Sequence, residues 1–172
     1  QTLIRATDEN TFLNDLCRII VELGGYKMAW IGYVPPDERK TVKPMASAGY
    51  EKGFIQTIHR VWDEAESQHC PSCTTIQTGR QTIMRNILNL PEYVAWRPEA
   101  LKRGYASSIS FPLIDQGQVF GVLNIYAAEP DAFDDDEVKL LDEMAKDLTY
   151  GIVTMRAREA HKKTEAQFVR AQ

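Results

Sequence analysis

The sequence predicts an α+β domain in which antiparallel strands lie between two amphipathic helices, one near each end of the chain. Apolar residues recur at helical spacing over residues 12–23 and again over residues 141–155. Between these two segments, residues 107–127 have the pattern of two strands joined by a turn. Strands combined with separate helices of this kind indicate a layer of helix packed on an antiparallel sheet.

Composition limits the possible functions. The 172 residues are enough for one domain with its own core, and the net charge of -4 comes from 24 acidic and 20 basic residues without a basic stripe. We therefore expect no binding to nucleic acid. No apolar run approaches the roughly 20 residues that span a bilayer, so we expect no direct membrane insertion. Three cysteines are an odd number for a secreted disulfide framework, which favours a cytoplasmic location.

The first third of the chain predicts a helix and two strands. The first helix should end at Gly24 and Gly25, which together form a plausible C-cap. Residues 27–34 read as a strand, and the turn residues that follow lead into a second strand over about residues 42–49. We expect these two strands to pair in antiparallel orientation.

The middle of the chain has weaker signals. Short helices are indicated around residues 54–58 and over residues 72–78, the second ending at Gly79. Residues 82–84 suit a short strand, and Pro98 should open a helical turn that ends near Gly104. Long irregular connections beside a sheet often carry function.

The hairpin over residues 107–127 allows two registers, of which one separates polar from apolar side chains. Pairing Ser110 with Asn124 and Ser108 with Tyr126, through a three-residue loop containing Gly117, puts four polar side chains on one face. The opposite face is then apolar. A sheet with one apolar face and one partly polar face under a loop indicates a pocket, although the polar residues could also simply face solvent.

The last helix has a defined start. Asp134 is the expected N-cap, Glu137 lies three residues on, and Phe133 with Val138 can form a hydrophobic staple across the cap. Apolar residues then alternate in steps of four and three, which is the pattern of a coiled-coil or bundle seam; they are Leu141, Ala145, Leu148, Ile152 and Met155. The same pattern also fits a helix that covers its own sheet.

Three segments together resemble a GAF domain: residues 16–34, residues 103–141 and the helix that follows them. The resemblance is greatest to GAF modules of bacterial multidomain sensors that carry PAS domains and end in a histidine kinase or a diguanylate cyclase. It covers roughly residues 3–158. It implies an antiparallel sheet of five to six strands, with the N- and C-terminal helices packed on one face and a ligand pocket with loops on the other.

The same resemblance implies partners and boundaries. The terminal helices of such domains commonly pair between subunits, so we expect a homodimer through the first and last helices and a covalently linked output domain, a kinase or a cyclase. Residues 1–158 would form the sensory domain, and residues 159–172 would be a helical linker toward a downstream domain.

The hairpin is also similar to that of bilin-binding GAF domains of phytochromes, in which a Ser-x-Ser pair lines the pocket. Ser108 and Ser110 match that pair, Tyr126 falls where those proteins have a pocket histidine, and Trp30 would face the pocket from the first strand. The Cys-His that anchors a bilin falls near Trp96, so we expect no covalent bilin. Trp96 could instead act as an aromatic lid, and the ligand's identity stays unknown.

The most reactive group of side chains in the sequence is the cluster His69-Cys70-Pro71-Ser72-Cys73. If Ser72 caps the following helix, Cys73 lies in its first turn, where a thiol pKa is lowered. His69, Cys70 and Cys73 could ligate a metal or haem, although a closed zinc site needs a fourth ligand. Cys70 and Cys73 could form a redox disulfide, or the loop could have no special role. Cys17 is expected in the core.

These observations favour a non-catalytic sensory domain that binds a small molecule or senses redox state and signals through a dimeric helical bundle. A ligand-free dimerisation or spacer module is the alternative. A third interpretation is a thiol enzyme similar to the free methionine sulfoxide reductases, which use three cysteines in a GAF fold, although their cysteine arrangement does not match this chain residue by residue.

Overall fold

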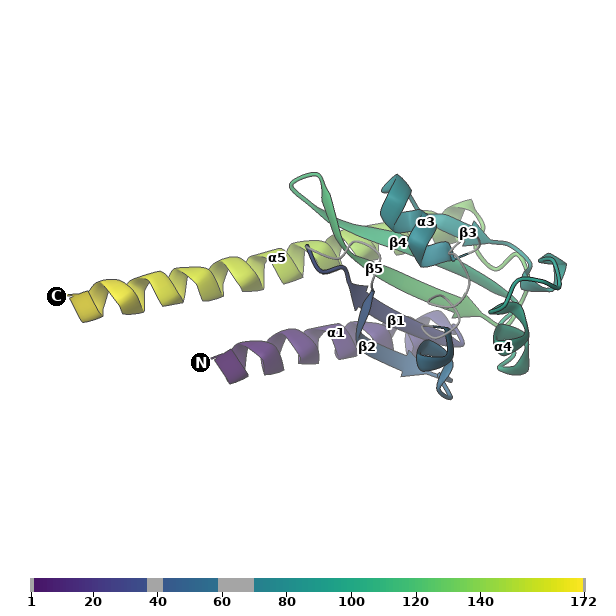
Figure 1. The fold of residues 1–172 in the computed structure, drawn as a ribbon, viewed down its shortest axis with the longest axis horizontal. Coiled ribbons are helices and arrows are strands. Elements are labelled where there is room, and N and C mark those ends of the chain that lie inside the picture. Colours follow the sequence, from purple (N-terminus) through teal and green to yellow (C-terminus); the bar gives the residue numbers. More distant parts are fainter. Residues whose placement is uncertain (1, 37–41, 59–69, 172) are drawn as a thin grey trace.

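The computed structural model describes residues 2–36, 42–58 and 70–171, which form a five-stranded antiparallel sheet with helices on both faces (Figure 1). Across the sheet the strand order is β2-β1-β5-β4-β3. The strands are β1 (Met28–Tyr33), β2 (Lys43–Gly49), β3 (Thr82–Met84), β4 (Ser107–Asp115) and β5 (Gln118–Ala127). The predicted α+β class and the predicted pairing of the first two strands are confirmed.

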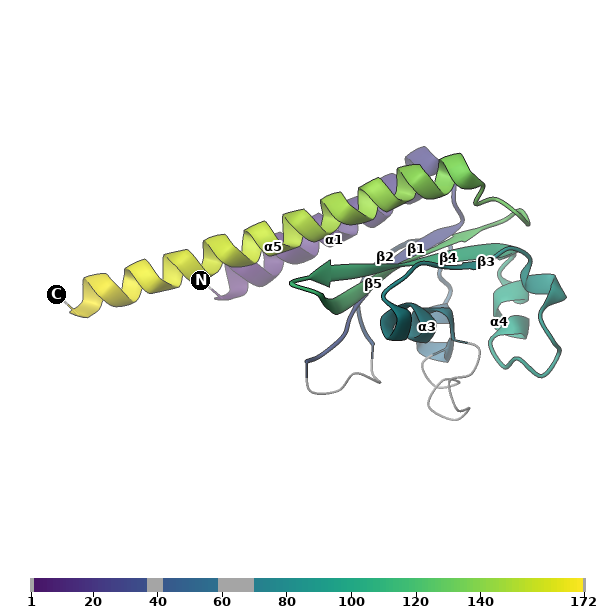
Figure 2. The ribbon, with the colours of Figure 1, turned by 90° about the horizontal axis from the view of Figure 1, so that it is seen from above.

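The long helices and the short helices lie on opposite sides of this sheet. Seen edge-on, α1 (Thr2–Gly24) and α5 (Asp135–Ala171) run side by side on one face (Figure 2). The other face carries α3 (Pro71–Thr78) and α4 (Arg97–Lys102). The 3-10 turn η1 (Ile87–Asn89) and a helical stretch at residues 54–58 complete the described elements. In the described part of the chain, no helix has both the length and the apolar composition of a membrane span.

The end of α1 and the start of α5 lie where the sequence predicts them. Gly25 ends α1 in the left-handed conformation, and its N–H donates to the carbonyl of Val21 at 3.1 Å. At the start of α5, the Asp134 carboxylate accepts the backbone N–H of Glu137 at 2.8 Å. The Glu137 carboxylate in turn accepts the Tyr26 hydroxyl, which ties the first turn of α5 to the segment before β1.

The β4–β5 hairpin has the predicted register, with Ser110 opposite Asn124 and Ser108 opposite Tyr126. The predicted three-residue loop is wrong. Asp115 pairs with Gln118 across a two-residue turn, and a register shift between Leu113 and Ile114 restores the expected pairing. Both turn residues, Gln116 and Gly117, have positive φ, as this tight hairpin turn requires.

The apolar face of the sheet packs against α1 and α5 and forms a large buried cluster. Four residues of the predicted coiled-coil seam belong to it: Leu141, Ala145, Leu148 and Ile152. Leu148 and Ile152 are both 0% exposed within the single chain. These side chains therefore cover the domain's own sheet and are not available to a partner helix, which corrects their interpretation as a seam between subunits.

Candidate functional site

The four polar side chains predicted on one face of the hairpin are all buried there. Ser108, Ser110, Asn124 and Tyr126 lie within the sheet and have exposed fractions of 5% or less. Ser110 Oγ donates to Asn124 Oδ1 at 2.6 Å, a hydrogen bond that the cross-strand pairing of these two residues makes possible. The polar face is thus an interior site and does not simply face solvent.

Helix α3 completes this polar arrangement. Ser72 Oγ donates to the same Asn124 Oδ1 at 2.8 Å, and Thr75 Oγ1 lies 2.8 Å from Thr82 Oγ1 on β3. We call Ser72, Thr75, Ser110 and Asn124 the polar hub. Sequence patterns did not reveal the roles of Ser72 and Thr75, although their spacing of three residues places them on one side of a helix. Because all four residues are buried, the hub fixes α3 over β4 and β5.

Two buried polar groups on this face of the hairpin have no hydrogen-bond partner within the described part of the chain. They are the hydroxyl of Ser108 and the amide nitrogen of Asn124. Leaving a buried polar group unpaired costs about 1–3 kcal/mol, so such groups in native proteins are nearly always paired with protein, water or a ligand. An Asn amide and a Ser hydroxyl can donate to and accept from a small polar ligand.

Aromatic residues surround these polar groups. Trp30 on β1 lies opposite Asn124, and Tyr126 lies opposite Ser108. Burial raises the pKa of Tyr126 to about 12, with a smaller opposing effect from its hydrogen bond with Trp30. Tyr126 therefore stays neutral at physiological pH. Trp96 is 4% exposed and packs in the same cluster as Trp30 and Tyr126, so it is a core residue at the start of α4 and not an exposed lid.

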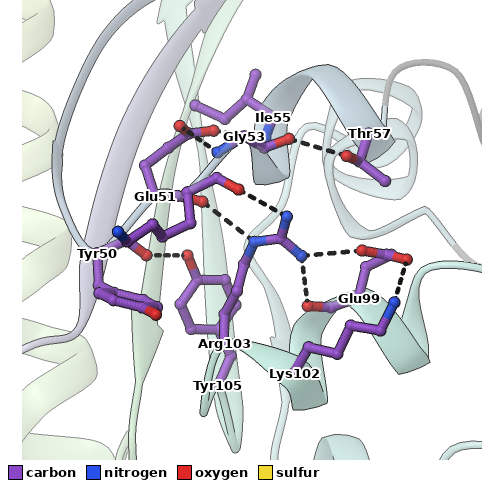
Figure 3. Close-up of polar contacts among 10 residues, drawn as sticks. Tyr50, Glu51, Gly53, Ile55, Thr57, Glu99, Lys102, Arg103 and Tyr105 are labelled. Atoms are coloured by element: carbon purple, nitrogen blue, oxygen red, sulfur yellow. Dashed lines mark hydrogen bonds and ion pairs between the residues drawn. The ribbon is translucent and has the colours of Figure 1, made fainter.

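Figure 3 shows an arginine clasp, formed by Arg103 between the end of α4 and the segment after β2. Arg103 donates to the backbone carbonyls of Glu51 at 3.2 Å and Lys52 at 2.7 Å, and it pairs with the Glu99 carboxylate at 3.0 Å. The hydrogen bonds from Arg103 and Lys102 lower the pKa of Glu99. The clasp joins the end of α4 to the segment after β2.

The clasp also positions an aromatic side chain beside the site. The guanidinium of Arg103 lies 5.5 Å from the ring centre of Phe54. Phe54 in turn makes edge contacts with Tyr105 and Tyr126, at centroid separations of 5.0 and 5.3 Å. No sequence pattern indicated this clasp, because the acceptors on Glu51 and Lys52 are backbone carbonyls about 50 residues from Arg103 in the chain.

Cys70 and Cys73 form a disulfide at the start of α3. The predicted cap at Ser72 is wrong: Cys70 is the N-cap, and its sulfur accepts the backbone N–H of Cys73 at 3.1 Å. Ser72 points to Asn124 instead. Bonded to each other, the two sulfurs are not metal ligands. His69, the third candidate ligand, lies outside the described residues.

Cys17 is on the other side of the sheet. It is fully buried in the cluster formed by α1, α5 and the apolar sheet face, as predicted, and burial raises the pKa of its thiol to about 12. The sheet separates this thiol from the Cys70–Cys73 pair, so the three cysteines do not form one reactive group.

A groove of about 810 Å³ lies elsewhere, at the edge of the sheet. Its walls are α5, the end of β4 and the turn between α3 and β3, with Arg80, Ile114, Lys146 and Tyr150 among the lining residues. Among the predicted site residues that the structure describes, none lines it. The polar residues known to line the groove are half-buried or exposed, so we assign the candidate site to the polar hub.

Comparisons with solved structures support the fold. A GAF domain region of a proposed membrane protein from Geobacter sulfurreducens is 16% identical, with 90% of this chain and 98% of that chain covered and a TM-score of 0.70. A domain of a proposed two-component sensor histidine kinase from Sinorhizobium meliloti is 20% identical, with coverages of 88% and 95% and a TM-score of 0.67. A type II free methionine-R-sulfoxide reductase from Thermoplasma acidophilum is 14% identical, with coverages of 87% and 95% and a TM-score of 0.65.

These structural similarities have identities too low to transfer an activity, and they show the fold alone. No curated protein matches the chain. The model of the GAF domain family does match, over residues 6–153, which is most of the sequence. Because this match covers more than half of the sequence, and the sheet order and the helix pair agree with it, the chain belongs to the GAF domain family.

Proposed function

We propose that this GAF domain is a non-catalytic sensor that binds a small molecule at the polar hub and signals through α1 and α5. GAF domains are in general sensory or regulatory domains. In this one the polar hub would receive the input and the two long helices would carry the output. The expected ligand is small and polar. It would accept a hydrogen bond from the Asn124 amide, and it would either donate a hydrogen bond to the Ser108 hydroxyl or accept one from it.

The position of Asn124 carries the proposal. Its side chain binds Ser72 and Ser110 on one face of β5, while the adjacent Leu123 and Ile125 belong to the buried cluster beneath α1 and α5. A ligand that moved Asn124 would also move its two neighbours, because three consecutive residues of a strand share one backbone. For the ligand to switch the domain, it must bind one arrangement more tightly than the other, by a coupling of typically about 1–3 kcal/mol.

Native mass spectrometry tests the binding part of this proposal. The wild-type domain should carry extra mass that is lost on denaturation, and Ser110→Trp should remove it by filling the site. Ser47→Trp is the matched control, since Ser47 is exposed on β2. A bare protein mass, or extra mass that survives Ser110→Trp, would contradict a ligand at the hub.

The output would be a rearrangement of α1 and α5 within a homodimer, passed to a covalently linked kinase or cyclase domain. Exposed apolar side chains support this, now that the predicted seam is known to be internal. Leu23 on α1, Leu140 and Tyr150 on α5, and Phe168 and Val169 near the end of α5 are all exposed large hydrophobic residues. Residues 159–172 would then act as the linker, since α5 continues to Ala171 without a break.

A ligand-free spacer module is the second candidate, and the aromatic packing favours it. Trp30, Trp96 and Tyr126 are buried together in one cluster, so the domain's own side chains fill much of the space over the polar face. Under this alternative, Ser110→Trp would destabilise the domain without changing any bound mass.

A reductase similar to the free methionine sulfoxide reductases has less support. Two reductases of this class are among the solved structures that this fold resembles, at 14% and 17% identity. A three-cysteine mechanism needs the thiols to meet, and Cys17 is buried on the opposite side of the sheet from Cys70 and Cys73.

A further inference from the structure

We propose that the Cys70–Cys73 disulfide undergoes reversible exchange with small-molecule thiols, that the incoming thiolate attacks the sulfur of Cys73, and that the state of the pair sets how firmly α3 is held on the sheet. The exchange chemistry stands on its own. Only its consequence for signalling rests on the sensory function proposed above.

The two cysteines differ in exposure. Cys70 is 1% exposed and is covered by the domain, whereas Cys73 is partly exposed on the first turn of α3. Its neighbour Thr74 is exposed as well. Thiolate attack on a disulfide requires access to the sulfur that is attacked. Because Cys73 is the more exposed residue of the two, we take its sulfur as the site of attack.

The buried sulfur is suited to be the leaving group. Cys70 is the N-cap of α3, and its Sγ accepts the backbone N–H of Cys73 at 3.1 Å. After cleavage, the same N–H and the positive end of the helix would stabilise the Cys70 thiolate. A stabilised thiolate has a lower pKa and leaves faster, so attack at Cys73 is favoured by the leaving group as well as by access.

The exchange can be written as two balanced steps. A thiolate RS⁻ bonds to Cys73 Sγ, the bond between Cys73 and Cys70 breaks, and its electron pair leaves on Cys70 as a thiolate. A second RS⁻ then attacks the RS sulfur of the mixed disulfide, which releases RSSR and the Cys73 thiolate. Two electrons pass from two small thiols to the protein, and RSSR is the oxidant for the reverse reaction.

The oxidation state can reach the sheet through Ser72, which lies between the two cysteines. Ser72 belongs to the ring of residues that the disulfide closes, and its hydroxyl donates to Asn124 at 2.8 Å. An isolated helix of eight residues is not stable in water, so α3 depends on its contacts with the sheet and on constraints within its own first turn. The disulfide is such a constraint, since it joins the N-cap Cys70 to Cys73. Opening it frees the first turn and should loosen the hydrogen bond between Ser72 and Asn124.

Glutathione is the probe for the exchange. The domain is equilibrated in mixtures of reduced and oxidised glutathione, the thiols are trapped by alkylation, and each cysteine is located by peptide mass spectrometry. In the Cys70→Ser variant we expect a mixed disulfide with glutathione to accumulate on Cys73. In the Cys73→Ser variant, the extent of modification of Cys70 should be at least about tenfold lower. Buried Cys17 is the internal control and should react only after denaturation. Equal modification in the two variants, or a wild-type pair that stays oxidised in every mixture, would overturn the proposal.

Amide hydrogen exchange tests the effect on α3. Reduction of the disulfide should raise the amide exchange rate of residues 74–78 by about tenfold. The double variant Cys70→Ser/Cys73→Ser should show the faster rate under both oxidising and reducing conditions. Unchanged exchange would overturn the structural consequence. Failure here is distinct from failure of the proposed ligand site, because the Ser110→Trp test of bound mass does not depend on the glutathione ratio.

Discussion

The two faces of the sheet are built from the same strands but differ in what holds them together. On one face, Ala29, Ile31, Leu123 and Ile125 pack with α1 and α5 in a cluster of apolar side chains. On the other face, the alternate residues Trp30, Asn124 and Tyr126 lie among hydroxyls, aromatic rings and a disulfide. The first face is held mainly by apolar packing, while the second combines an apolar cluster with the hydrogen-bonding chemistry.

The covering helices differ in the same way. α1 has 23 residues and α5 has 37, whereas α3 has 8, is joined to the sheet by hydrogen bonds of the polar hub, and has its first turn closed by the disulfide. Local stability generally follows buried apolar contact, so α3 should open more readily than α1 or α5. A signal that begins at α3 would therefore start in the less stable layer and end in the more stable one.

The largest expected effect comes from the apolar face. Leu148→Ala should lower the free energy of unfolding by about 2–5 kcal/mol, because Leu148 is completely buried against the sheet. Glu143→Ala is the control on the same helix, and since Glu143 is exposed, the change should be small. Urea unfolding measures both. A stable Leu148→Ala monomer that had only lost a dimer would restore the seam interpretation.

On the polar face the expected effect is smaller. Asn124→Ala leaves the hydroxyls of Ser72 and Ser110 without their acceptor, which should cost about 1–3 kcal/mol of unfolding free energy. The triple variant Ser72→Ala/Ser110→Ala/Asn124→Ala no longer contains the unpaired hydroxyls. It should therefore recover part of the stability that Asn124→Ala loses. If the three changes were simply additive, the hub would not act as one network.

The register of the β4–β5 hairpin could be predicted from the sequence, and the contact of Asn124 with α3 could not. Alternating polarity is a local property, so the order of residues along the chain was enough to identify Ser108, Ser110, Asn124 and Tyr126 and their pairing. The bond from Ser72 joins residues 52 positions apart, and nothing in a local pattern indicates it. The same limit explains the seam: helical spacing shows that one side of α5 is buried, but not which surface buries it.

A pH dependence should distinguish Tyr126 from an ordinary tyrosine. Its pKa rises from 10 in the unfolded chain to about 12 in the folded domain, so the neutral form is favoured by folding. This stabilisation is complete below pH 10 and is lost as the pH rises toward 12, at up to about 1.4 kcal/mol per pH unit. Stability measured between pH 9 and pH 12 should fall less steeply in Tyr126→Phe. Parallel curves would place Tyr126 in water.

The smallest expected effect is at the ion pair that links the two long helices. Glu9 on α1 accepts from Arg156 on α5 at 3.2 Å and from the Tyr33 hydroxyl at 3.0 Å. Because Arg156 is partly exposed, Glu9→Gln should cost less than about 1 kcal/mol. High salt should reduce the difference between wild type and variant. A loss as large as that of Leu148→Ala would show that this pair, and not the apolar packing, holds the helices.

Transmission from the polar face to the helix pair is best tested by amide hydrogen exchange in α5 of Asn124→Ala. We predict faster exchange over residues 141–152, which pack beneath β4 and β5, and no change over residues 160–171, where α5 runs past the sheet (Figure 1). Ile87→Ala is the control, since Ile87 is buried on the polar side and is not part of the hub; it should leave residues 141–152 unchanged under native conditions. Faster exchange confined to α3 in Asn124→Ala, with α5 as in the wild type, would contradict this transmission.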